Sequence, residues 1–330
     1  MVRSRFKALA LLSGGLDSIL AVKVIQLQDI DVEGIVFQSS FFNNHKVHNI
    51  ASRLGIKIHP IDINKELIRI IEKPKYGFGK NINPCIDCHL LMISKACGLL
   101  KKYKADFIIT GEVAGERPKS QNYRALQLIS DQCGCGSLLL RPLSAKKLPE
   151  TRVEEEGIVD REKLYGITGK NRKEQIVLAA KFGIDYYPQP AGGCLLTVPR
   201  FSDRLRINLK TKKLSGTDLA LLKFGRHFLT KDEEKIIIGR DEEDNNRLSQ
   251  AVPEGYLIFE LDKAMGPLGV LCSTEYHAKE NIIKTASLVV RYSKLRNEKT
   301  VRVKYFKKGG EVHFLSVSGK DHKELELEHI

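Results

Sequence analysis

The feature that most constrains the fold is an alternation of short apolar runs with amphipathic stretches over the first 190 residues. The stretches at 17–28 and 45–55 have helical periodicity, and Gly55 follows the second as a helix-ending glycine. The runs with the length of buried strands lie at 6–12, 32–40, 56–63 and 106–110. This alternation predicts βαβ units and a Rossmann-like, mainly parallel sheet. Ligands of such sheets bind beyond the C-terminal strand ends, so the loops after residues 12, 37 and 110 are the expected site.

The sequence changes character at 188–204, where "PQPAGGCLLTVPRFSDR" is rich in proline and glycine. Beyond it, four runs predict the strands of a smaller α+β unit: "EKIIIGR", "GYLIFEL", "SLVVRYS" and "TVRVKYF". We therefore expect two domains, at residues 1–200 and 201–330. The closing "ELELEHI" is charged and is expected to be frayed.

Composition narrows the class of protein. With 42% hydrophobic and 28% charged residues, the chain is able to bury a core and is not of the disordered type. The apolar runs are too short to cross a membrane, and the basic N-terminus passes directly into a loop motif, so we expect no signal peptide. We expect a cytoplasmic protein, in which seven cysteines indicate thiols or metal ligands more readily than structural disulfides.

The net charge of +14 favours a polyanionic partner, although solubility alone also explains a basic chain. After residue 200 there are 24 basic and 20 acidic residues, which gives +4 and leaves +10 for the first 200 residues. The N-terminal half is therefore the more basic one.

A second feature, "SGGLDS" at 13–18, stands where the first strand ends and the first helix begins. Ser13, Gly14 and Gly15 predict a tight turn whose backbone N–H groups face an anion, and Asp17 and Ser18 open the helix. It is not a Walker loop, because no Gly-Lys-Ser/Thr follows. A glycine-rich turn with a helix cap is the simpler alternative.

Strand, "SGGLDS" and helix together resemble the PP-loop of ATP pyrophosphatases, which cleave ATP between the α and β phosphates. The resemblance implies an adenine nucleotide alpha hydrolase-like fold, with Ser13, Gly14, Gly15, Asp17 and Ser18 binding the phosphates and Mg²⁺ as cofactor. It also implies that Phe37 and Gln38 lie beside the adenosine, and that Gly111, in the loop after the fourth strand, belongs to the nucleotide site.

The cysteines offer several chemistries. Cys85 and Cys88 in "NPCIDCH" have metal or redox spacing, but a four-cysteine zinc site needs a second CxxC, which the chain lacks. We expect "CGC" at 133–135 to be a flexible turn, Cys97 to be a buried apolar thiol in a helix, and Cys272 to belong to a strand core. Cys194 follows two glycines in "AGGCLL", which favours a reactive thiol or a ligand.

Cys85, Cys88 and Cys194 resemble the cysteines of PP-loop tRNA thiolases, the 2-thiouridylases and 4-thiouridine synthetases. In that family a uracil oxygen is adenylylated and sulfur then displaces AMP. The resemblance implies that the three cysteines hold a 4Fe–4S cluster, with a cysteine persulfide as the alternative. It also implies tRNA as substrate, free sulfide or a cysteine desulfurase as sulfur donor, and a homodimer.

Two further segments support the resemblance. "TGEVAGERPKSQN" at 110–122 follows the fourth strand and combines acidic and basic groups. "GKNRKEQ" at 169–175 carries Lys170, Arg172 and Lys173, which are expected to face phosphates of RNA or ATP. A solvated helix start is the alternative for this basic segment.

The C-terminal unit resembles the NFACT-type RNA-binding module through "FGRHF" and "IIIGRDEEDN". Arg226, His227, Arg240 and Lys263 are candidate phosphate contacts. The acidic run "RDEEDNN" is expected to face away from RNA or to cap a helix.

The sequence thus predicts an ATP-dependent tRNA sulfurtransferase that releases AMP and pyrophosphate. An AMP-forming ligase of the same fold is the alternative, although it needs no cysteine trio. A non-catalytic RNA-binding protein with a degenerate ATP site is the third, and the intact "SGGLDS" argues against it. The sequence leaves open which uridine carbonyl, O2 or O4, is thiolated.

Overall fold

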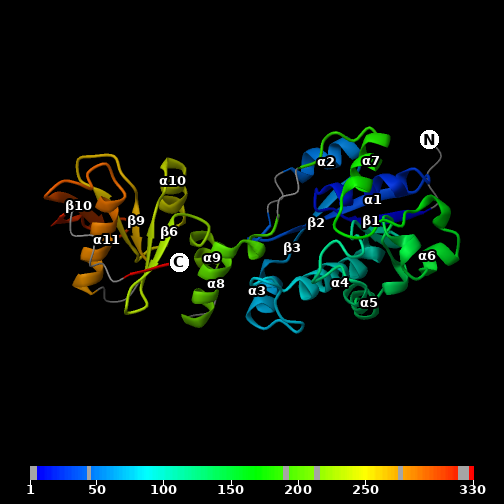
Figure 1. Cartoon of the computed structure of the whole chain (residues 1–330), viewed down its shortest axis with the longest axis horizontal. Helices are drawn as coiled ribbons and strands as arrows, with labels where there is room; N and C mark the ends of the chain where they lie inside the picture. The colour runs from blue at the N-terminus through cyan, green and yellow to red at the C-terminus, as the bar shows by residue number, and fades with distance from the viewer. Residues whose placement is uncertain (1–5, 43–45, 189–192, 212–215, 274–277, 319–326) are drawn as a thin grey trace. The chain divides into compact units, whose positions relative to one another are not determined.

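Figure 1 shows the computed structural model of the chain, which describes residues 6–42, 46–188, 193–211, 216–273, 278–318 and 327–330. The chain divides into two compact units, Met1–Val198 and Pro199–Ile330, close to the boundary expected at residue 200. Within the described residues, no helix combines the length and the apolarity that crossing a membrane requires.

The first unit is built on a five-stranded sheet in the order β3-β2-β1-β4-β5, with every neighbouring pair parallel. This confirms the predicted Rossmann-like sheet. The strands are β1 (Lys7–Leu11), β2 (Asp31–Gln38), β3 (Ile58–Asp62), β4 (Phe107–Thr110) and β5 (Leu139–Leu140).

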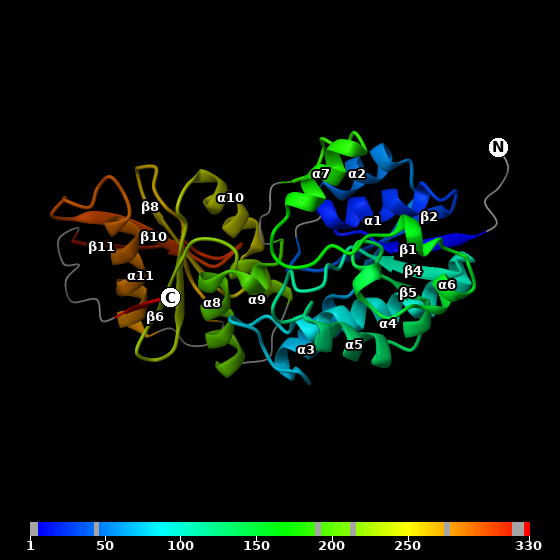
Figure 2. The same cartoon turned by 45° about the vertical axis from the view of Figure 1, so that its right-hand side comes forward.

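Helices cover both faces of this sheet (Figures 1 and 2). One layer holds α1 (Leu16–Gln26), α2 (Val47–Leu54) and α7 (Lys173–Lys181), and the other α3 (Asn64–Glu72), α4 (Cys85–Tyr103) and α5 (Tyr123–Gln132). Alternate residues of β1 point to opposite layers, so Ala8 and Ala10 join one apolar core and Leu9 the other. Short elements complete the unit: η1 (Gly136–Leu138), η2 (Ala145–Lys147), α6 (Arg152–Glu155), η3 (Arg161–Lys163) and η4 (Leu195–Thr197).

The predicted end of the second helix is confirmed. Gly55 caps α2 in the left-handed conformation, with φ of 67°, and its N–H bonds back to the last turn. Residue 45, where this helix was expected to begin, and residues 189–192 of the Pro- and Gly-rich segment lie outside the described residues.

The second unit is a seven-stranded antiparallel sheet in the order β11-β10-β8-β9-β7-β6-β12, which confirms the α+β class. Its strands are β6 (Arg226–Leu229), β7 (Lys235–Ile238), β8 (Leu257–Leu261), β9 (Gly269–Leu271), β10 (Val301–Phe306), β11 (His313–Val317) and β12 (Glu328–His329). Its helices are α8 (Pro199–Thr211), α9 (Gly216–Leu221), α10 (Glu242–Ala251) and α11 (Lys279–Arg291).

One predicted strand is wrong. "SLVVRYS" belongs largely to α11, whose buried Ala286, Val289 and Val290 recur at helical spacing and pack on the sheet. Part of the closing segment is also ordered as a strand, because β12 pairs with β6. The acidic run "RDEEDNN" caps and opens α10, where Asp241 accepts a hydrogen bond from the Asp244 N–H, as one of the two alternatives predicted.

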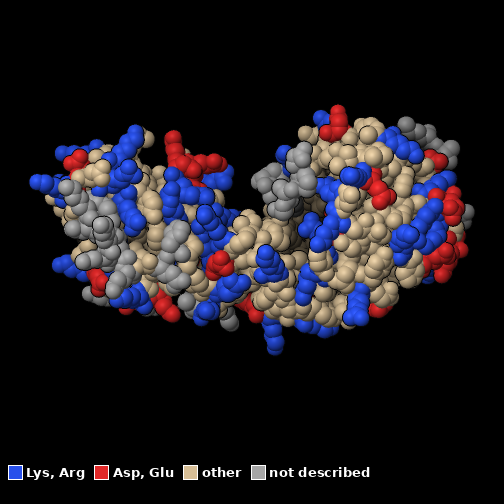
Figure 3. Space-filling model, viewed as in Figure 1, with Lys and Arg blue, Asp and Glu red and all other residues tan. Residues whose placement is uncertain are grey.

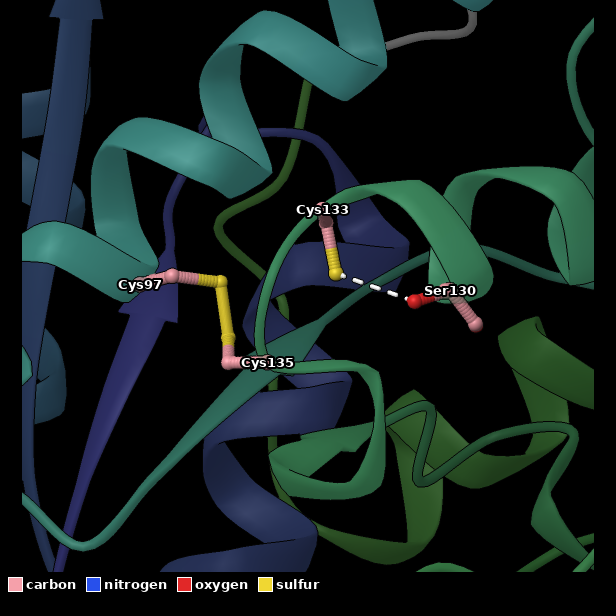
Figure 4. The surroundings of a disulfide bond; sticks show 4 residues. All are labelled: Cys97, Ser130, Cys133 and Cys135. Carbon is pink, nitrogen blue, oxygen red and sulfur yellow. Dashed lines mark hydrogen bonds between the residues drawn. A yellow bond between two sulfur atoms is a disulfide. The ribbon is translucent and has the colours of Figure 1, made fainter.

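The predictions for Cys97 and for "CGC" are also wrong. Cys97 of α4 and Cys135 form a disulfide, with their Cα atoms 5.8 Å apart (Figure 4). The expectation of free thiols failed because α4 and the segment after α5 meet only in the folded chain, 38 residues apart in sequence.

Candidate active site

The phosphate loop occupies the turn between β1 and α1. Gly14 has a φ of +79°, a conformation that favours glycine, and Gly15 is the N-cap of α1 without a side-chain hydrogen bond to the first turn. The Ser18 hydroxyl donates to the Gly15 carbonyl at 2.8 Å, and the Gly15 N–H donates to Ser13 Oγ at 3.3 Å. The helix therefore offers first-turn N–H donors to an anion rather than to its own cap.

Gly111 brings the loop after β4 against this helix start. A Cβ atom at Gly111 would lie 2.5 Å from the Ser18 backbone nitrogen and 2.6 Å from the Asp17 carbonyl carbon. Only glycine permits this approach. The loops after β1 and β4 are therefore in direct backbone contact, as the rule for parallel sheets predicts.

Asp17 is the charged centre of the loop. Burial raises the pKa of its carboxyl, while the positive charges of Arg172 and Arg117 lower it. In the part of the chain that the structure describes, Asp17 Oδ1 and Arg172 Nε are buried without a hydrogen-bond partner. Buried polar atoms are seldom left unpaired, and such orphans mark a place for a bound group.

Glu116 is a second carboxylate here, in the segment 110–122, and no motif singled it out. Burial raises its pKa, and the negative charge of Asp17 raises it further, whereas Arg117 and Arg172 lower it. Two mutually repelling carboxylates beside two arginines are suited to a divalent cation and a phosphate chain.

Phe37 and Gln38 end β2 at the same edge of the sheet as the phosphate loop, since β1 and β2 are paired in parallel. Phe37 is buried, and the exposed Gln38 accepts the Ile63 N–H through its carbonyl oxygen. Their position fits the predicted adenosine side.

Cys85 and Cys88 lie in the first turn of α4, which Asp87 anchors. The Asp87 carboxylate accepts hydrogen bonds from the Lys75 and Tyr76 backbone N–H groups at 2.9 and 3.1 Å. The Cys85 sulfur accepts one from the Asn83 side-chain amide at 3.0 Å. The two thiols therefore have a fixed, partly buried setting.

Cys194 is brought to the same place by backbone contacts. Cys194 forms an isolated antiparallel β-bridge with Phe42, and the Leu195 N–H donates a hydrogen bond to the Phe41 carbonyl at 2.9 Å. The Asn81 side chain, just before the CxxC, donates to the Thr197 carbonyl at 2.7 Å. These bonds tie the Cys194 segment both to the loop after β2 and to the start of α4.

The three thiols affect one another electrostatically. Burial raises the pKa of Cys88, and the charges of Cys194 and Cys85 raise it further. Burial also raises the pKa of Cys194 to about 11, with an added rise from Cys85, although the Leu196 amide and Arg117 act in the opposite direction. Because Arg117 also acts on Asp17, this one side chain lies within electrostatic reach of both the phosphate loop and the cysteines.

The spacing of these sulfur atoms excludes a preformed single-ion site. Thiolates on one tetrahedral zinc lie about 3.8 Å apart, as follows from a Zn–S distance of about 2.3 Å. Among the described residues, the one group of three His, Cys, Asp or Glu ligand atoms within 4.8 Å of one another belongs to Cys97, Cys133 and Cys135. The sulfur atoms of Cys85, Cys88 and Cys194 therefore do not all lie within 4.8 Å of one another.

A largely buried group of three residues, Glu112, Arg141 and His89, adjoins the CxxC segment through His89. Glu112 accepts a hydrogen bond from Arg141 Nε at 2.8 Å, and its other oxygen lies 2.6 Å from Nδ1 of His89, which follows Cys88. Burial would raise the pKa of Glu112, but Arg141 and His89 lower it to about 2. The sequence does not indicate a pairing among these three residues, because they lie in three separate segments.

The basic residues predicted to contact RNA fall into two groups. Lys170, Lys173 and Lys263 are exposed. Arg226 stacks over Tyr292, and Arg240 pairs with Asp244, so both have partners within their own unit. Figure 3 shows Lys and Arg side chains over the visible face of each unit.

The prediction for His227 is wrong. Its ring is 1% exposed, and Nε2 lies 2.7 Å from the Phe224 carbonyl. Burial lowers its pKa to about 3, aided by the charge of Arg204, so the imidazole is neutral near pH 7. A buried neutral ring has no access to a phosphate.

A cavity of about 430 Å³ lies elsewhere in the first unit, lined by residues of α5, η1, β5 and α6. None of the phosphate-loop residues or of Cys85, Cys88 and Cys194 is among its lining residues. It is therefore not the pocket of the candidate active site.

The first unit is an α/β domain with a candidate phosphate loop, the second is an α+β domain, and sequence comparison matches each of them to a known domain. Residues 6–156 match the profile described as the tRNA methyl transferase HUP domain, and residues 225–329 match the NFACT protein RNA binding domain. The chain therefore combines a HUP domain with an NFACT-type domain, which confirms the resemblance predicted from the motifs.

Curated relatives are tRNA-specific 2-thiouridylases MnmA. The protein of Sulfurimonas denitrificans is 32% identical over 115 residues, which cover 32% of this chain and 34% of the relative. That of Mesoplasma florum is 27% identical over 201 residues, covering 48% of this chain and 53% of the relative. The chain thus spans between a third and about half the length of these relatives.

Two similar solved structures have related descriptions. One is the U34-tRNA thiolase NcsA of Methanococcus maripaludis with its [4Fe-4S] cluster, at 13% identity and a TM-score of 0.35, covering 67% of this chain and 71% of that one. The other is a 4-thiouridine synthetase–RNA complex with bound ATP, at 18% identity and a TM-score of 0.36, covering 54% and 52%. Scores this low carry no argument about function.

Proposed function

We propose that this protein is an ATP-dependent tRNA thiolase that replaces a uridine carbonyl oxygen by sulfur. The observation that carries the proposal is the set of contacts that hold the Cys194 segment to the loop after β2 and to the start of α4, because the loop after β2 lies at the edge of the sheet that also carries the phosphate loop. Phosphate chemistry and sulfur chemistry would then share one site. An AMP-forming ligase needs only the phosphate chemistry and has no use for the three cysteines.

The first step is adenylylation of the tRNA. The uridine carbonyl oxygen attacks the α-phosphorus of ATP, and pyrophosphate leaves with the electron pair of the α–β bridging bond. The turn at 13–15 and the N–H groups of α1 would hold the phosphates, with Arg172 and Arg117 neutralising charge. Asp17, whose Oδ1 has no hydrogen-bond partner, and the neighbouring Glu116 would hold Mg²⁺, which would neutralise phosphate charge.

The second step is displacement by sulfur. A sulfur nucleophile adds to the activated carbon, and AMP leaves with the former carbonyl oxygen, so no net oxidation or reduction of the base occurs. The loop at 110–122 carries Glu116 and Arg117, which belong to the charged surroundings of Asp17. We propose that this loop positions the adenylylated base for attack by sulfur.

The three cysteines fit a 4Fe–4S cluster as the sulfur-handling group. They are partly buried and mutually repelling when ionised, and their sulfur atoms do not all lie within 4.8 Å of one another. Cys85, Cys88 and Cys194 would hold such a cluster, which would supply iron chemistry for sulfur transfer. A cysteine persulfide is the alternative for the same three residues, and it needs no iron.

The second unit would bind the tRNA. The exposed Lys263 and Arg240 and the partly exposed Arg226 are the phosphate contacts that we retain there, with Lys170 and Lys173 in the first unit. Free sulfide or a cysteine desulfurase would supply the sulfur.

The test separates the two steps. The full chain, reconstituted with iron and sulfide without oxygen, is incubated with tRNA, ATP, Mg²⁺ and sulfide. Asp17→Ala is expected to lower pyrophosphate release at least about tenfold, whereas Cys194→Ala keeps pyrophosphate release and loses thiouridine. Asp131→Ala, at an exposed residue, and Cys272→Ala, at a cysteine of the second unit, serve as matched controls.

Two results contradict the proposal. Wild-type thiouridine yield from Cys194→Ala would remove the cysteine trio from the reaction. An adenylylated product that takes up ammonia in place of sulfide would assign the protein to the ligases. For the cluster itself, we expect about four iron and four acid-labile sulfide atoms per chain, and we expect Cys88→Ala to lose both.

A further inference from the structure

A second group of cysteines lies apart from the candidate active site. Cys97 comes from α4, and Cys133 and Cys135 come from the segment that follows α5 (Figure 4). Their three sulfur atoms lie within 4.8 Å of one another. The phosphate loop and the thiolation chemistry make no use of them.

The disulfide accounts for only two of these sulfur atoms. Cys97 and Cys135 are bonded to each other, while Cys133 is a free thiol with 3% of its surface exposed. The Cys133 sulfur makes one weak hydrogen bond, to the Ser130 carbonyl at 3.4 Å. A bridge that only joined α4 to this segment would not require a third cysteine aimed at the same point.

We propose that Cys97, Cys133 and Cys135 form a zinc site when the disulfide is reduced. Three thiolates around one tetrahedral zinc lie about 3.8 Å apart, given a Zn–S distance of about 2.3 Å. The sulfur atoms already satisfy a limit of 4.8 Å, so small side-chain adjustments bring all three to one ion. This spacing distinguishes the group from Cys85, Cys88 and Cys194, whose sulfur atoms do not all lie within that limit.

The surroundings favour a cation. Cys133 is the C-cap of α5, where the carbonyl groups of the last turn carry partial negative charge. Cys97 and Cys135 are partly exposed, so water has access as the fourth ligand. No fourth His, Cys, Asp or Glu ligand atom of the described residues joins the group.

The two states interconvert by a balanced reaction. A dithiol, such as dithiothreitol or a protein dithiol, supplies two electrons and two protons to the Cys97–Cys135 bond and becomes a disulfide itself. Zinc binding then releases the three thiol protons. The oxidised chain is therefore the metal-free form, and the reduced chain is the metal-binding form.

The test uses the full chain with serine in place of Cys85, Cys88, Cys194 and Cys272, so that only these three cysteines remain. The protein is reduced with a phosphine, freed of reductant without oxygen, and titrated with Co²⁺ as a spectroscopic substitute for zinc. One equivalent is expected to bind with thiolate-to-metal absorption and to be displaced by Zn²⁺. The oxidised protein is expected to bind none.

Cys133→Ala is the decisive variant, because it keeps the two cysteines of the disulfide and with them the fold of the oxidised chain. Its affinity for Co²⁺ in the reduced form is expected to fall at least about tenfold. Equal binding by Cys133→Ala and its parent, or no thiolate absorption in the reduced parent, overturns the proposal. Should the four-serine parent fail to fold, wild type and Cys133→Ala are compared directly, and the loss of one zinc equivalent is the expected difference.

Discussion

Replacing Gly111 by alanine tests the contact on which the phosphate site depends. The added methyl group would lie 2.5 Å from the Ser18 nitrogen, 2.6 Å from the Asp17 carbonyl carbon and 2.7 Å from the Ser18 Cα. All three are backbone atoms, so no side-chain rotation relieves the clash. Overpacking of this kind costs about 1–3 kcal/mol, and displacement of the helix start should weaken ATP binding at least about tenfold.

Gly98→Ala is the matched control, because Gly98 lies exposed within α4 and a Cβ atom there would meet nothing within 4 Å. It should stabilise the protein by roughly 0.5–1 kcal/mol through helix propensity and leave ATP binding unchanged. Urea unfolding gives the stability of both variants, and equilibrium binding of a labelled ATP analogue gives the affinity. Wild-type stability and wild-type ATP affinity in Gly111→Ala would refute the inferred contact between the two loops.

Two further predictions follow from the buried charges. Glu112→Gln should lower the free energy of unfolding by about 3–5 kcal/mol, because the charge of the buried Arg141 loses its carboxylate partner and keeps only the neutral acceptors of Ser130 and Leu126, whereas the half-exposed Glu66→Gln should cost less than about 1 kcal/mol. Since the pKa of Glu112 is lowered from 4.5 to about 2, its stabilisation is present above pH 4.5 and lost as the pH falls through about 2; unfolding curves that show equal costs would contradict this. The raised pKa values of Asp17 and Glu116 mean that protons compete with Mg²⁺ at higher pH than for ordinary carboxylates, so Mg²⁺ affinity measured by calorimetry should fall on acidification, and fall less steeply in an Asp17→Asn variant, in which only Glu116 still titrates.

Periodicity was enough to predict the parallel sheet and its active edge. β1, β2 and β4 are short apolar runs that end in loops, and the first glycine-rich loop stands directly after β1, so local pattern and global topology agree. Pattern failed for α11, because "SLVVR" is equally compatible with a strand and with the buried face of a helix. The preceding residues decide that question, since they continue the helical spacing.

The candidate site was predicted only where its residues lie in motifs. The phosphate loop and the three cysteines stand in recognisable segments. His89 and Glu112 also lie in the quoted segments, but their pairing with each other and with Arg141 depends on contacts that only the folded chain makes. The Cys97–Cys135 bond was missed for the same reason. His227 was misassigned because a basic residue in a motif gives no sign of whether its ring is buried.

The most direct test of the thiolase proposal is mass spectrometry of the nucleosides in tRNA treated with this protein. Unmodified tRNA is incubated without oxygen with the reconstituted chain, ATP, Mg²⁺ and sulfide, then digested and compared with a reaction that lacks ATP. The account predicts thiouridine that appears only with ATP and disappears in the Cys194→Ala variant. Uridine that remains unmodified, while the same protein preparation cleaves ATP and binds tRNA, would contradict it.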